Sequence, residues 1–156
     1  MQETEFDTAL LEGPGRRIEH SLKRESLLRE AEASLERLGI DAIDLYQIHW
    51  PIPEPDIEEG WAALAELKDQ GLVRHIGLSN FHVHELRRIQ EIAPVETVQP
   101  QYSLLVREAE EEILPYCERG GIGVIVYSPP DQVGPIAGTA NLGLSTDDIA
   151  EIEGRA

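Results

Sequence analysis

The chain has 156 residues, of which 41% are apolar and 28% charged, proportions of a globular protein and not of a disordered or fibrous one. Its 13 basic and 30 acidic residues give a formal net charge of −17, which argues against nucleic acid and anionic membrane surfaces as partners. No apolar run reaches the roughly 18 residues of a membrane-spanning helix, and the N-terminus has no signal-peptide pattern. The single cysteine, Cys117, excludes an internal disulfide and a cysteine-based zinc site. We therefore expect one cytoplasmic domain.

The acid excess has two interpretations. The only lysines are Lys23 and Lys68, whereas glutamates crowd residues 108–112. A solvated acidic surface is the simpler interpretation. A high-salt cytoplasm would also suit such a surface, because salt screens the repulsion between like charges. The second interpretation predicts a melting temperature that climbs steeply with molar KCl.

The first regular element is predicted after residue 21. Residues 1–21 contain Gly13, Pro14 and Gly15 and show no sustained period, so we expect a loosely attached arm. From Arg24, leucines and alanine recur at helical spacing until Gly39, which predicts an amphipathic helix with a glycine stop. Residues 43–49 then have the composition of a buried strand, which ends at a loop containing prolines.

Helices and strands alternate over the rest of the central region. We expect helices around Trp61 up to Gly71, over residues 83–92 and over residues 108–119. Strands are expected at residues 73–78, 95–102 (interrupted by Pro100) and 122–127. This alternation with short connections is typical of βαβ units and predicts an α/β fold with a parallel sheet covered by helices.

Two parallel architectures compete, the open doubly wound sheet and the closed barrel. The sequence contains neither a G-x-G-x-x-G turn nor a Walker-type lysine loop, which favours the barrel. Barrel enzymes place their chemistry at the carboxyl ends of the strands. Here those ends carry His49, Ser79, Asn80, Gln99 and Tyr127, a set that suits a flat heterocycle with a carboxamide. Each residue taken alone is more often structural, as a helix cap, a strand partner or a core side chain.

Four segments together resemble the aldo-keto reductases. They are IDLYQIHWP from residue 43, GLVRHIGLSNF from residue 71, VQPQYS from residue 98 and GVIVYSP from residue 123. The similarity covers residues 21–130 without interruption. It implies a (β/α)8 TIM barrel that binds NADP(H) without a Rossmann fold and passes hydride to a small-molecule carbonyl substrate, an aldehyde or a ketone.

The resemblance also implies roles for individual residues. His49 would orient the substrate carbonyl, and Trp50 would line the substrate pocket. The cofactor would be bound at its carboxamide by Ser79, Asn80 and Gln99, at its ring by Tyr127 and near its pyrophosphate by Ser128. No metal is expected, because His82 and His84 lie two apart, which on a helix points them to different faces.

The sequence also departs from the family pattern. The catalytic aspartate, tyrosine and lysine of these enzymes lie upstream of the helix that starts here near Arg24, and neither residues 6–7 nor Lys23 match them. After Tyr127, residues 131–139 resemble the last barrel strand and residues 144–149 the closing helix, so the helix between and the basic 2′-phosphate stretch are missing. Because such a barrel takes about 250 residues, we expect a truncated or internally deleted, incomplete barrel. This single domain over 1–156 would comprise an arm (1–21), central βα units (22–130) and a remnant of the last strand and closing helix (131–156).

Three functions remain open. The chain is predicted to be an oxidoreductase by descent that is not competent alone. It could instead be a nucleotide-binding or interaction module, a half-barrel that self-associates through exposed edges or pairs with another chain. Such an incomplete barrel would expose its sheet edges and the apolar interior faces of residues 43–48 and 122–126. The third reading is a non-functional remnant.

Overall fold

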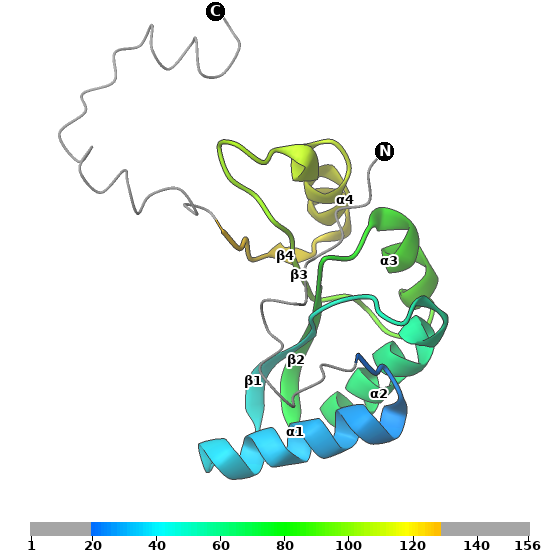
Figure 1. The fold of residues 1–156 in the computed structure, drawn as a ribbon, viewed down its shortest axis with the longest axis vertical. Helices are drawn as coiled ribbons and strands as arrows, with labels where there is room; N and C mark the ends of the chain where they lie inside the picture. The colour runs from blue at the N-terminus through cyan, green and yellow to red at the C-terminus, as the bar shows by residue number, and fades with distance from the viewer. Residues whose placement is uncertain (1–19, 129–156) are drawn as a thin grey trace, which may run out of the picture.

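The computed structural model describes residues 20–128, so nearly all of the predicted arm and the whole predicted remnant at 131–156 lie outside the described residues. Four parallel strands form one sheet in chain order (Figure 1). They are β1 (Ile43–Ile48), β2 (Val73–Ser79), β3 (Thr97–Gln99) and β4 (Gly123–Val124). The parallel sheet predicted from the sequence is therefore confirmed.

Helices connect the strands and lie along one side of the curving sheet (Figure 1). They are α1 (Arg24–Leu38), α2 (Ile57–Asp69), α3 (Val83–Ile89) and α4 (Ile113–Gly120), with short 3-10 turns η2 (Glu54–Asp56) and η3 (Glu108–Glu110). The alternation of helix and strand is the one that the hydrophobic pattern predicts.

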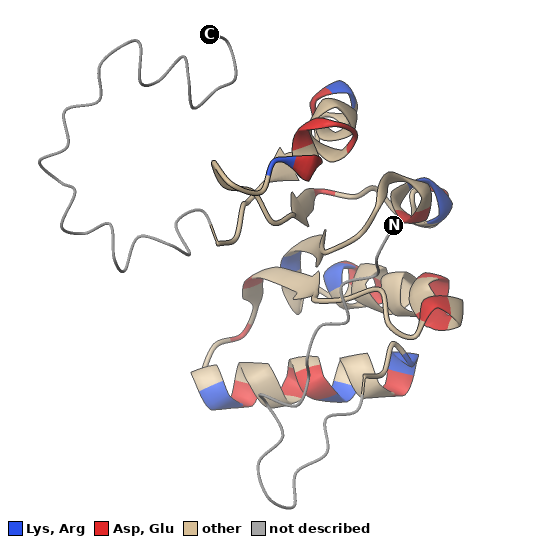
Figure 2. Cartoon of the chain, turned by 45° about the horizontal axis from the view of Figure 1, so that its top comes forward, with Lys and Arg blue, Asp and Glu red and all other residues tan. Residues whose placement is uncertain are grey.

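The helix α1 shows how the local sequence sets an element. Leu27 and Ala31 are buried, while acidic and basic residues alternate along the rest of the helix (Figure 2). Gly39 ends the helix with φ 64°, and its N–H donates to the carbonyls of Leu35 and Glu36. A residue without a Cβ adopts this left-handed conformation at little cost, so the glycine stop is confirmed.

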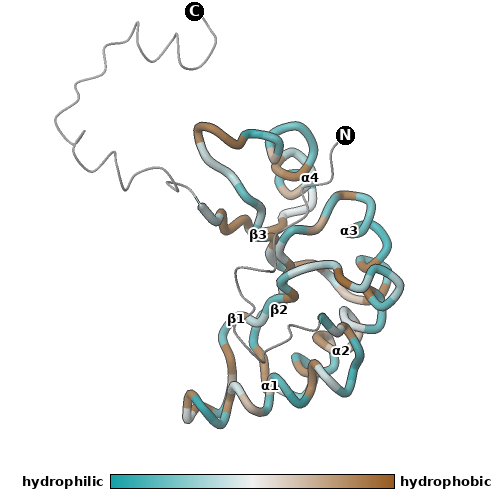
Figure 3. Tube along the Cα trace, in the orientation of Figure 1, coloured by the Kyte–Doolittle hydropathy of each residue, from teal (hydrophilic) through white to brown (hydrophobic). Residues whose placement is uncertain are grey.

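The core lies between the helices and the sheet, and Trp61 of α2 is its largest fully buried side chain. The Nε1 of Trp61 donates a hydrogen bond of 3.0 Å to the carbonyl of Ala93, so the buried indole has its polar atom satisfied. Apolar stretches of the chain follow the strands and the inward sides of the helices (Figure 3). The other large side chains that are fully buried in the core are Ile57, Leu64, Leu67, Val73, Ile76, Leu78, Leu86, Ile89, Val98 and Cys117.

Four predicted elements are shorter than expected. The strand predicted at 95–102 comprises only Thr97–Gln99, because Pro100 follows it and has no N–H to donate to the sheet. The acidic helix predicted at 108–119 is divided into η3 and α4, because Pro115 has no N–H to donate to the carbonyl of Glu111 and its ring crowds that carbonyl. The helix predicted at 83–92 ends at Ile89, where an N–H···O bond from Ile92 to the Ile89 carbonyl tightens the chain into a turn.

The strand predicted at 122–127 is also shorter in the structure than expected. Only Gly123 and Val124 are strand, although the N–H groups of Ile125 and Tyr127 still donate to the carbonyls of Val98 and Pro100. Pro100 cannot donate in return, so the ladder is interrupted there and resumes only at the isolated parallel bridge between Gln101 and Tyr127. The strand is exposed, as is Ile125, and β1 is mostly half-buried, not fully buried as expected.

One row of residues crosses all four strands just before their carboxyl ends. Gln47 pairs with Gly77, Gly77 with Thr97, and Thr97 with Gly123. The Nε2 of Gln47 donates a 3.3 Å hydrogen bond to Thr97 Oγ1 across the glycine between them. A Cβ at Gly77 would lie 2.0 Å from that Thr97 oxygen, so only glycine allows the two side chains to meet. No helix within residues 20–128 has the length and apolarity needed to cross a membrane.

Candidate active site

The polar residues predicted to act together follow the strands at one edge of the sheet. His49 comes directly after β1, Ser79 ends β2 and Asn80 follows it, and Gln99 ends β3. Tyr127 lies beyond β4, where a parallel bridge joins it to Gln101. Parallel strands bring their carboxyl ends to the same edge, so the predicted clustering of these residues is what the structure shows.

Asn80 lies at the centre of this cluster. Its φ of 63° is left-handed, a conformation that asparagine tolerates better than most residues. The Nδ2 atom donates to the His49 carbonyl at 2.9 Å and to Ser79 Oγ at 3.1 Å. The Oδ1 atom accepts a 2.7 Å hydrogen bond from the Tyr127 hydroxyl. A main-chain carbonyl only accepts, so the atom that faces His49 must be the amide nitrogen.

Ser79 continues the same network into β3. Its buried hydroxyl, 4% exposed, donates to the Gln99 carbonyl at 2.8 Å. The two N–H bonds of the Asn80 amide and the hydroxyl hydrogens of Ser79 and Tyr127 are therefore all used within the cluster. What these side chains can still offer a ligand is acceptor lone pairs on Asn80 Oδ1 and Ser79 Oγ.

The side-chain amide of Gln99 differs from its neighbours. It is half-buried and makes no hydrogen bond with any residue between 20 and 128. Its amide can therefore both donate to and accept from a ligand at this edge of the sheet. Gln99 can therefore offer a ligand an N–H donor, whereas the donors of Ser79 and Asn80 are already engaged with protein oxygens.

His49, Trp50 and Ser128 border the cluster. The His49 side chain is exposed, and its ring lies 5.6 Å from the Trp50 ring at an interplanar angle of 43°. Trp50 is half-buried. Ser128 follows Tyr127 with φ 50° and is half-buried at the end of the described residues.

No lysine is paired with a tyrosine in this structure, although both lysines of the chain lie within the described residues. Lys23 Nζ binds Asp56 at 2.7 Å and Glu59 at 3.0 Å, and Lys68 Nζ binds Glu96 at 2.8 Å. Burial raises the pKa of Tyr46. The hydrogen bond from the Tyr102 hydroxyl to the Glu110 carboxylate raises the pKa of Tyr102. Neither phenol thus has the lowered pKa of a tyrosine activated by a nearby cation.

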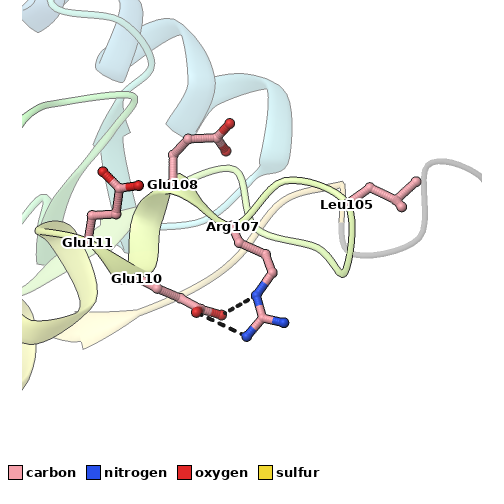
Figure 4. Close-up of a pocket in the computed structure, with 5 residues that line it drawn as sticks. All are labelled: Leu105, Arg107, Glu108, Glu110 and Glu111. Atoms are coloured by element: carbon pink, nitrogen blue, oxygen red, sulfur yellow. Dashed lines mark hydrogen bonds and ion pairs between the residues drawn. The ribbon is translucent and has the colours of Figure 1, made fainter. Parts of the chain in front are cut away.

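Two hollows in the described part lie away from the strand ends. One, of about 440 Å³, lies at η3, where Arg107 pairs with Glu110 and Leu105 points away from the acidic side chains (Figure 4). The other, of about 480 Å³, lies between α3 and α4 and includes Arg87 and Tyr116. Neither hollow is lined by a residue of the strand-end cluster.

The orientation of the two histidines at the start of α3 differs from the prediction. The rings of His82 and His84 stack at 5.9 Å with an interplanar angle of 13°, so the prediction that they point to different faces is wrong. His82 precedes the helix with an extended backbone, and helical spacing does not apply to it. Residues 20–128 contain no cluster of three histidine, cysteine or acidic side chains placed to hold a metal ion.

The sequence did not predict the row of residues in the sheet that lies next to the strand-end cluster. Gln47, Gly77 and Thr97 lie one or two residues before the ends of their strands, and their contact depends on a register that no local pattern reveals. Glu96 was missed for the same reason. Its carboxylate accepts from the Ile76 N–H at 3.0 Å and lies near Lys68 and His75, residues that come 20 to 28 positions earlier in the chain.

Comparisons of the sequence with known proteins all identify the same family. The model of the aldo/keto reductase family matches residues 14–153. The aldo-keto reductase YhdN of Bacillus subtilis is 44% identical over 104 residues, which cover 67% of this chain and 31% of that protein. The NADH-specific methylglyoxal reductase of Escherichia coli is 42% identical over 127 residues, which cover 80% of this chain and 39% of that protein.

Solved structures agree on the fold. A glycerol dehydrogenase from Gluconobacter oxydans superimposes with a TM-score of 0.70 and 32% identity over 84% of this chain and 38% of its own. An aldo/keto reductase from Klebsiella pneumoniae, solved with NADP and acetate, gives a TM-score of 0.66 and 28% identity. The match covers 85% of this chain and 48% of that one. The predicted α/β fold, part of a (β/α)8 barrel, is confirmed. The chain spans less than half the length of these relatives.

Proposed function

The chain belongs to the aldo/keto reductase family over residues 14–153, and from that premise we propose that its strand ends form the nicotinamide side of a carbonyl reductase site. The reaction proposed is the reduction of an aldehyde or ketone to an alcohol. The observation that carries the proposal is the hydrogen-bonded cluster of Ser79, Asn80 and Tyr127 beside the Gln99 amide, which has no hydrogen-bond partner among residues 20–128.

The donor and acceptor set of the cluster fits a carboxamide. A carboxamide needs acceptors for its N–H groups and a donor for its carbonyl oxygen. Asn80 Oδ1 and Ser79 Oγ retain acceptor lone pairs, and the Gln99 amide supplies the donor. A nicotinamide cofactor, when bound, supplies the hydride for carbonyl reduction. Tyr127 would lie against the nicotinamide ring and Ser128 near the pyrophosphate.

His49 and Trp50 are the residues proposed to face the substrate. The imidazole of His49 is exposed at the end of β1 and can hydrogen-bond a carbonyl oxygen. Trp50 holds its ring beside the imidazole and would form the apolar wall of the substrate pocket. We propose a small carbonyl compound as substrate, in line with the methylglyoxal reductase among the relatives.

The cofactor is proposed to be NADP(H), with weak preference over NADH. The similar aldo/keto reductase from Klebsiella pneumoniae was solved with NADP, which supports NADP(H) as the cofactor. The similar reductase from Escherichia coli is NADH-specific, which is the reason for proposing only a weak preference. The basic stretch expected to bind the 2′-phosphate has no match in the sequence, so we expect weak and similar affinities for NADPH and NADH.

Proton supply limits the proposed reaction in this chain. Both lysines are engaged with carboxylates, so residues 20–128 provide no tyrosine activated by lysine. General acid catalysis typically contributes about 10²- to 10⁴-fold, and we propose that turnover is reduced by a factor of this order. An ordinary turnover of simple aldehydes with NADPH would contradict that part of the proposal.

Thermal unfolding of the purified chain tests cofactor binding directly. A ligand that binds only the folded state raises the melting temperature, and the stabilisation grows with the logarithm of the ligand concentration divided by Kd. We expect similar, small increases with millimolar NADPH and NADH, and none with nicotinic acid used as a control. A large increase restricted to NADPH would show a 2′-phosphate site that this proposal omits, and no increase with either dinucleotide would refute the proposal.

A second candidate function is that of a half-barrel that associates with itself or with another chain. Leu104 and Leu105 are each 75% exposed, and Ile125 is 42% exposed beside the edge strand β4. Large exposed apolar side chains beside a strand whose outer edge has no partner among residues 20–128 are typical of association surfaces. Light scattering after size exclusion tests this candidate, since a strictly monomeric chain at 100 μM would exclude self-association.

A further inference from the structure

The sheet has two outer edges that no strand covers within residues 20–128. The strands pair in the order β1-β2-β3-β4, so β1 is open on the side away from β2, and β4 on the side away from β3. All neighbouring strands run parallel, and a barrel of this class closes with eight such strands. The described part therefore supplies half of the strands of a barrel and ends in an open edge on each side.

The exposed large apolar side chains of the described part gather at these two edges. Only Ile92, in the turn after α3, lies elsewhere. Some of them lie in the loop after β3, which begins beside β4, where the Tyr102 N–H lies 3.4 Å from the Tyr127 carbonyl. The β1 edge has Leu38, Ile40 and Ile52, and the β4 edge has Leu104, Leu105, Val124 and Ile125.

The apolar surface of the two edges together has the size that a stable interface needs. A Leu, Ile or Val side chain that becomes fully buried removes about 60 to 120 Å² of apolar surface from water. The exposed fractions at both edges add up to about four whole side chains, so covering them would remove about 250 to 450 Å² per copy. A standard interface buries about 800 Å² per partner, a little over half of it apolar. A partner that covers both edges would therefore bury enough apolar surface.

We propose that a second copy of this chain closes the barrel, with β4 of each copy beside β1 of the other. A two-fold axis along the barrel keeps all strands parallel and leaves no open edge. This closure rests on the second candidate function, self-association, for which it names the partner and the strand pairing. The strand ends of both copies would then face one mouth, and each copy would supply the wall opposite the other's candidate site.

A row of paired residues in the sheet gives the register of this contact. The row begins at Gln47 of β1 and ends at Gly123 of β4. In an eight-stranded barrel such a row returns to its first strand displaced by about eight residues, so two-fold symmetry gives about four residues per copy. The strand ends give the direction, because His49 lies two residues beyond the row, whereas Tyr127 lies four beyond it. The row should therefore continue at Ile43 of the partner's β1.

This register brings two apolar side chains of different copies together. Ile125 lies two residues after Gly123 and is 42% exposed, and Leu45 lies two residues after Ile43 and is half-buried. Both are on the face of the sheet that looks away from the helices, because the alternate row, which includes the buried Leu78, packs against the helices. Ile125 of each copy should therefore lie beside the partner's Leu45.

Cysteine cross-linking tests this contact in the full chain. Neighbouring strands lie about 4.8 Å apart, within the range of Cα separations that a disulfide spans. Leu45→Cys and Ile125→Cys are made in separate chains, and Cys117 is left in place because it is 1% exposed. We expect a covalent dimer when the two variants are mixed and oxidised, and none from either variant alone. Replacing Ile125→Cys by Ile92→Cys in the mixture is the matched control and should give no covalent dimer.

The affinity between copies is a second readout that needs no added cysteine. Each copy has a net charge of −17, so sedimentation should show a dimer that becomes tighter in molar KCl, which screens the repulsion. Ile125→Glu should weaken the dimer at least about tenfold, because it would place a charge in the interface. Ile92→Glu, at a similarly exposed position, should leave the affinity unchanged. Circular dichroism checks that each variant is folded.

The outcomes separate this geometry from self-association itself. A chain that stays monomeric at about 100 μM in molar KCl would refute both. A covalent dimer from Leu45→Cys or Ile125→Cys alone would show that like edges meet. Larger species without a dimer would show a pairing that does not close. These last two results, or a dimer whose mixed cysteines do not link, would overturn the proposed closure and leave self-association standing.

Discussion

Replacing Gly77 by alanine should destabilise the sheet next to the candidate site. A Cβ at this position would lie 2.0 Å from Thr97 Oγ1, 2.9 Å from the Thr97 carbonyl oxygen and 3.1 Å from Gln47 Nε2. The Thr97 side chain would have to rotate, and its hydrogen bond with Gln47 would be lost. The main-chain oxygen cannot move without shifting β3 itself.

The expected cost follows from these contacts. Overpacking a well-packed interior costs about 1 to 3 kcal/mol. The lost hydrogen bond adds about 1 kcal/mol. Replacing glycine in a strand returns about 0.5 to 1 kcal/mol of backbone entropy. We therefore expect Gly77→Ala to lower the free energy of unfolding by about 1 to 3 kcal/mol.

Urea unfolding followed by circular dichroism measures this change. Gly123→Ala is the matched control, because Gly123 lies in the same row and a Cβ there would be no closer than 3.3 Å to any neighbouring atom. We expect the control to lose less than about 1 kcal/mol. Combining Gly77→Ala with Thr97→Ala should recover part of the loss, since the closest contact disappears. Equal effects of the two glycine variants, or no recovery, would refute the packing argument.

Three further predictions concern charge and the thiol. Burial raises the pKa of Glu96, but hydrogen bonds from Lys68, the Ile76 N–H and His75 outweigh it and hold the pKa below the ordinary 4.5. Its ionised form therefore stabilises the fold above about pH 4.5, and this contribution fades as the pH falls through the lowered pKa. In urea titrations, Glu96→Gln should have a lower free energy of unfolding than the unaltered chain at pH 7, and the two values should converge near pH 3. A difference in free energy that does not change with pH would contradict the lowered pKa of Glu96. Cys117 is 1% exposed and burial raises the pKa of its thiol, so an aromatic disulfide reagent should react at least about 100-fold faster in urea than in buffer; similar rates would mean that the α4 region is open. With a net charge of −17, molar KCl should raise the melting temperature, and a flat dependence would exclude adaptation to high salt.

Local patterns predicted the elements because each helix and strand carries its own signal. The α1 helix is specified by its apolar spacing and by Gly39, and both act within a few residues. The limits of η3, α4 and β4 were predicted less well, since Pro115 and Pro100 remove main-chain donors whose partners lie elsewhere. Proline marks such breaks in the sequence, but the structure decides which bond is lost.

The sequence predicted which polar residues lie together at the strand ends, but it did not predict the hydrogen bonds between them. Polar residues after consecutive strands indicate His49, Ser79, Asn80, Gln99 and Tyr127, because parallel strands share one active edge. Their hydrogen bonds depend on the register and on the left-handed backbone at Asn80. The sequence therefore could not separate Asn80, whose amide is hydrogen-bonded, from Gln99, whose amide has no partner in the described part of the chain.

Saturation-transfer NMR of NADPH with the purified chain tests the central claim most directly, because it reports which ligand protons approach the protein. The strand-end cluster is proposed to hold the nicotinamide half of the cofactor. We expect the strongest transfer to the nicotinamide protons, and its loss in Gln99→Leu but not in Gln101→Leu. Transfer confined to the adenine protons, or no transfer at all, would contradict the assignment of these strand ends as a nicotinamide site.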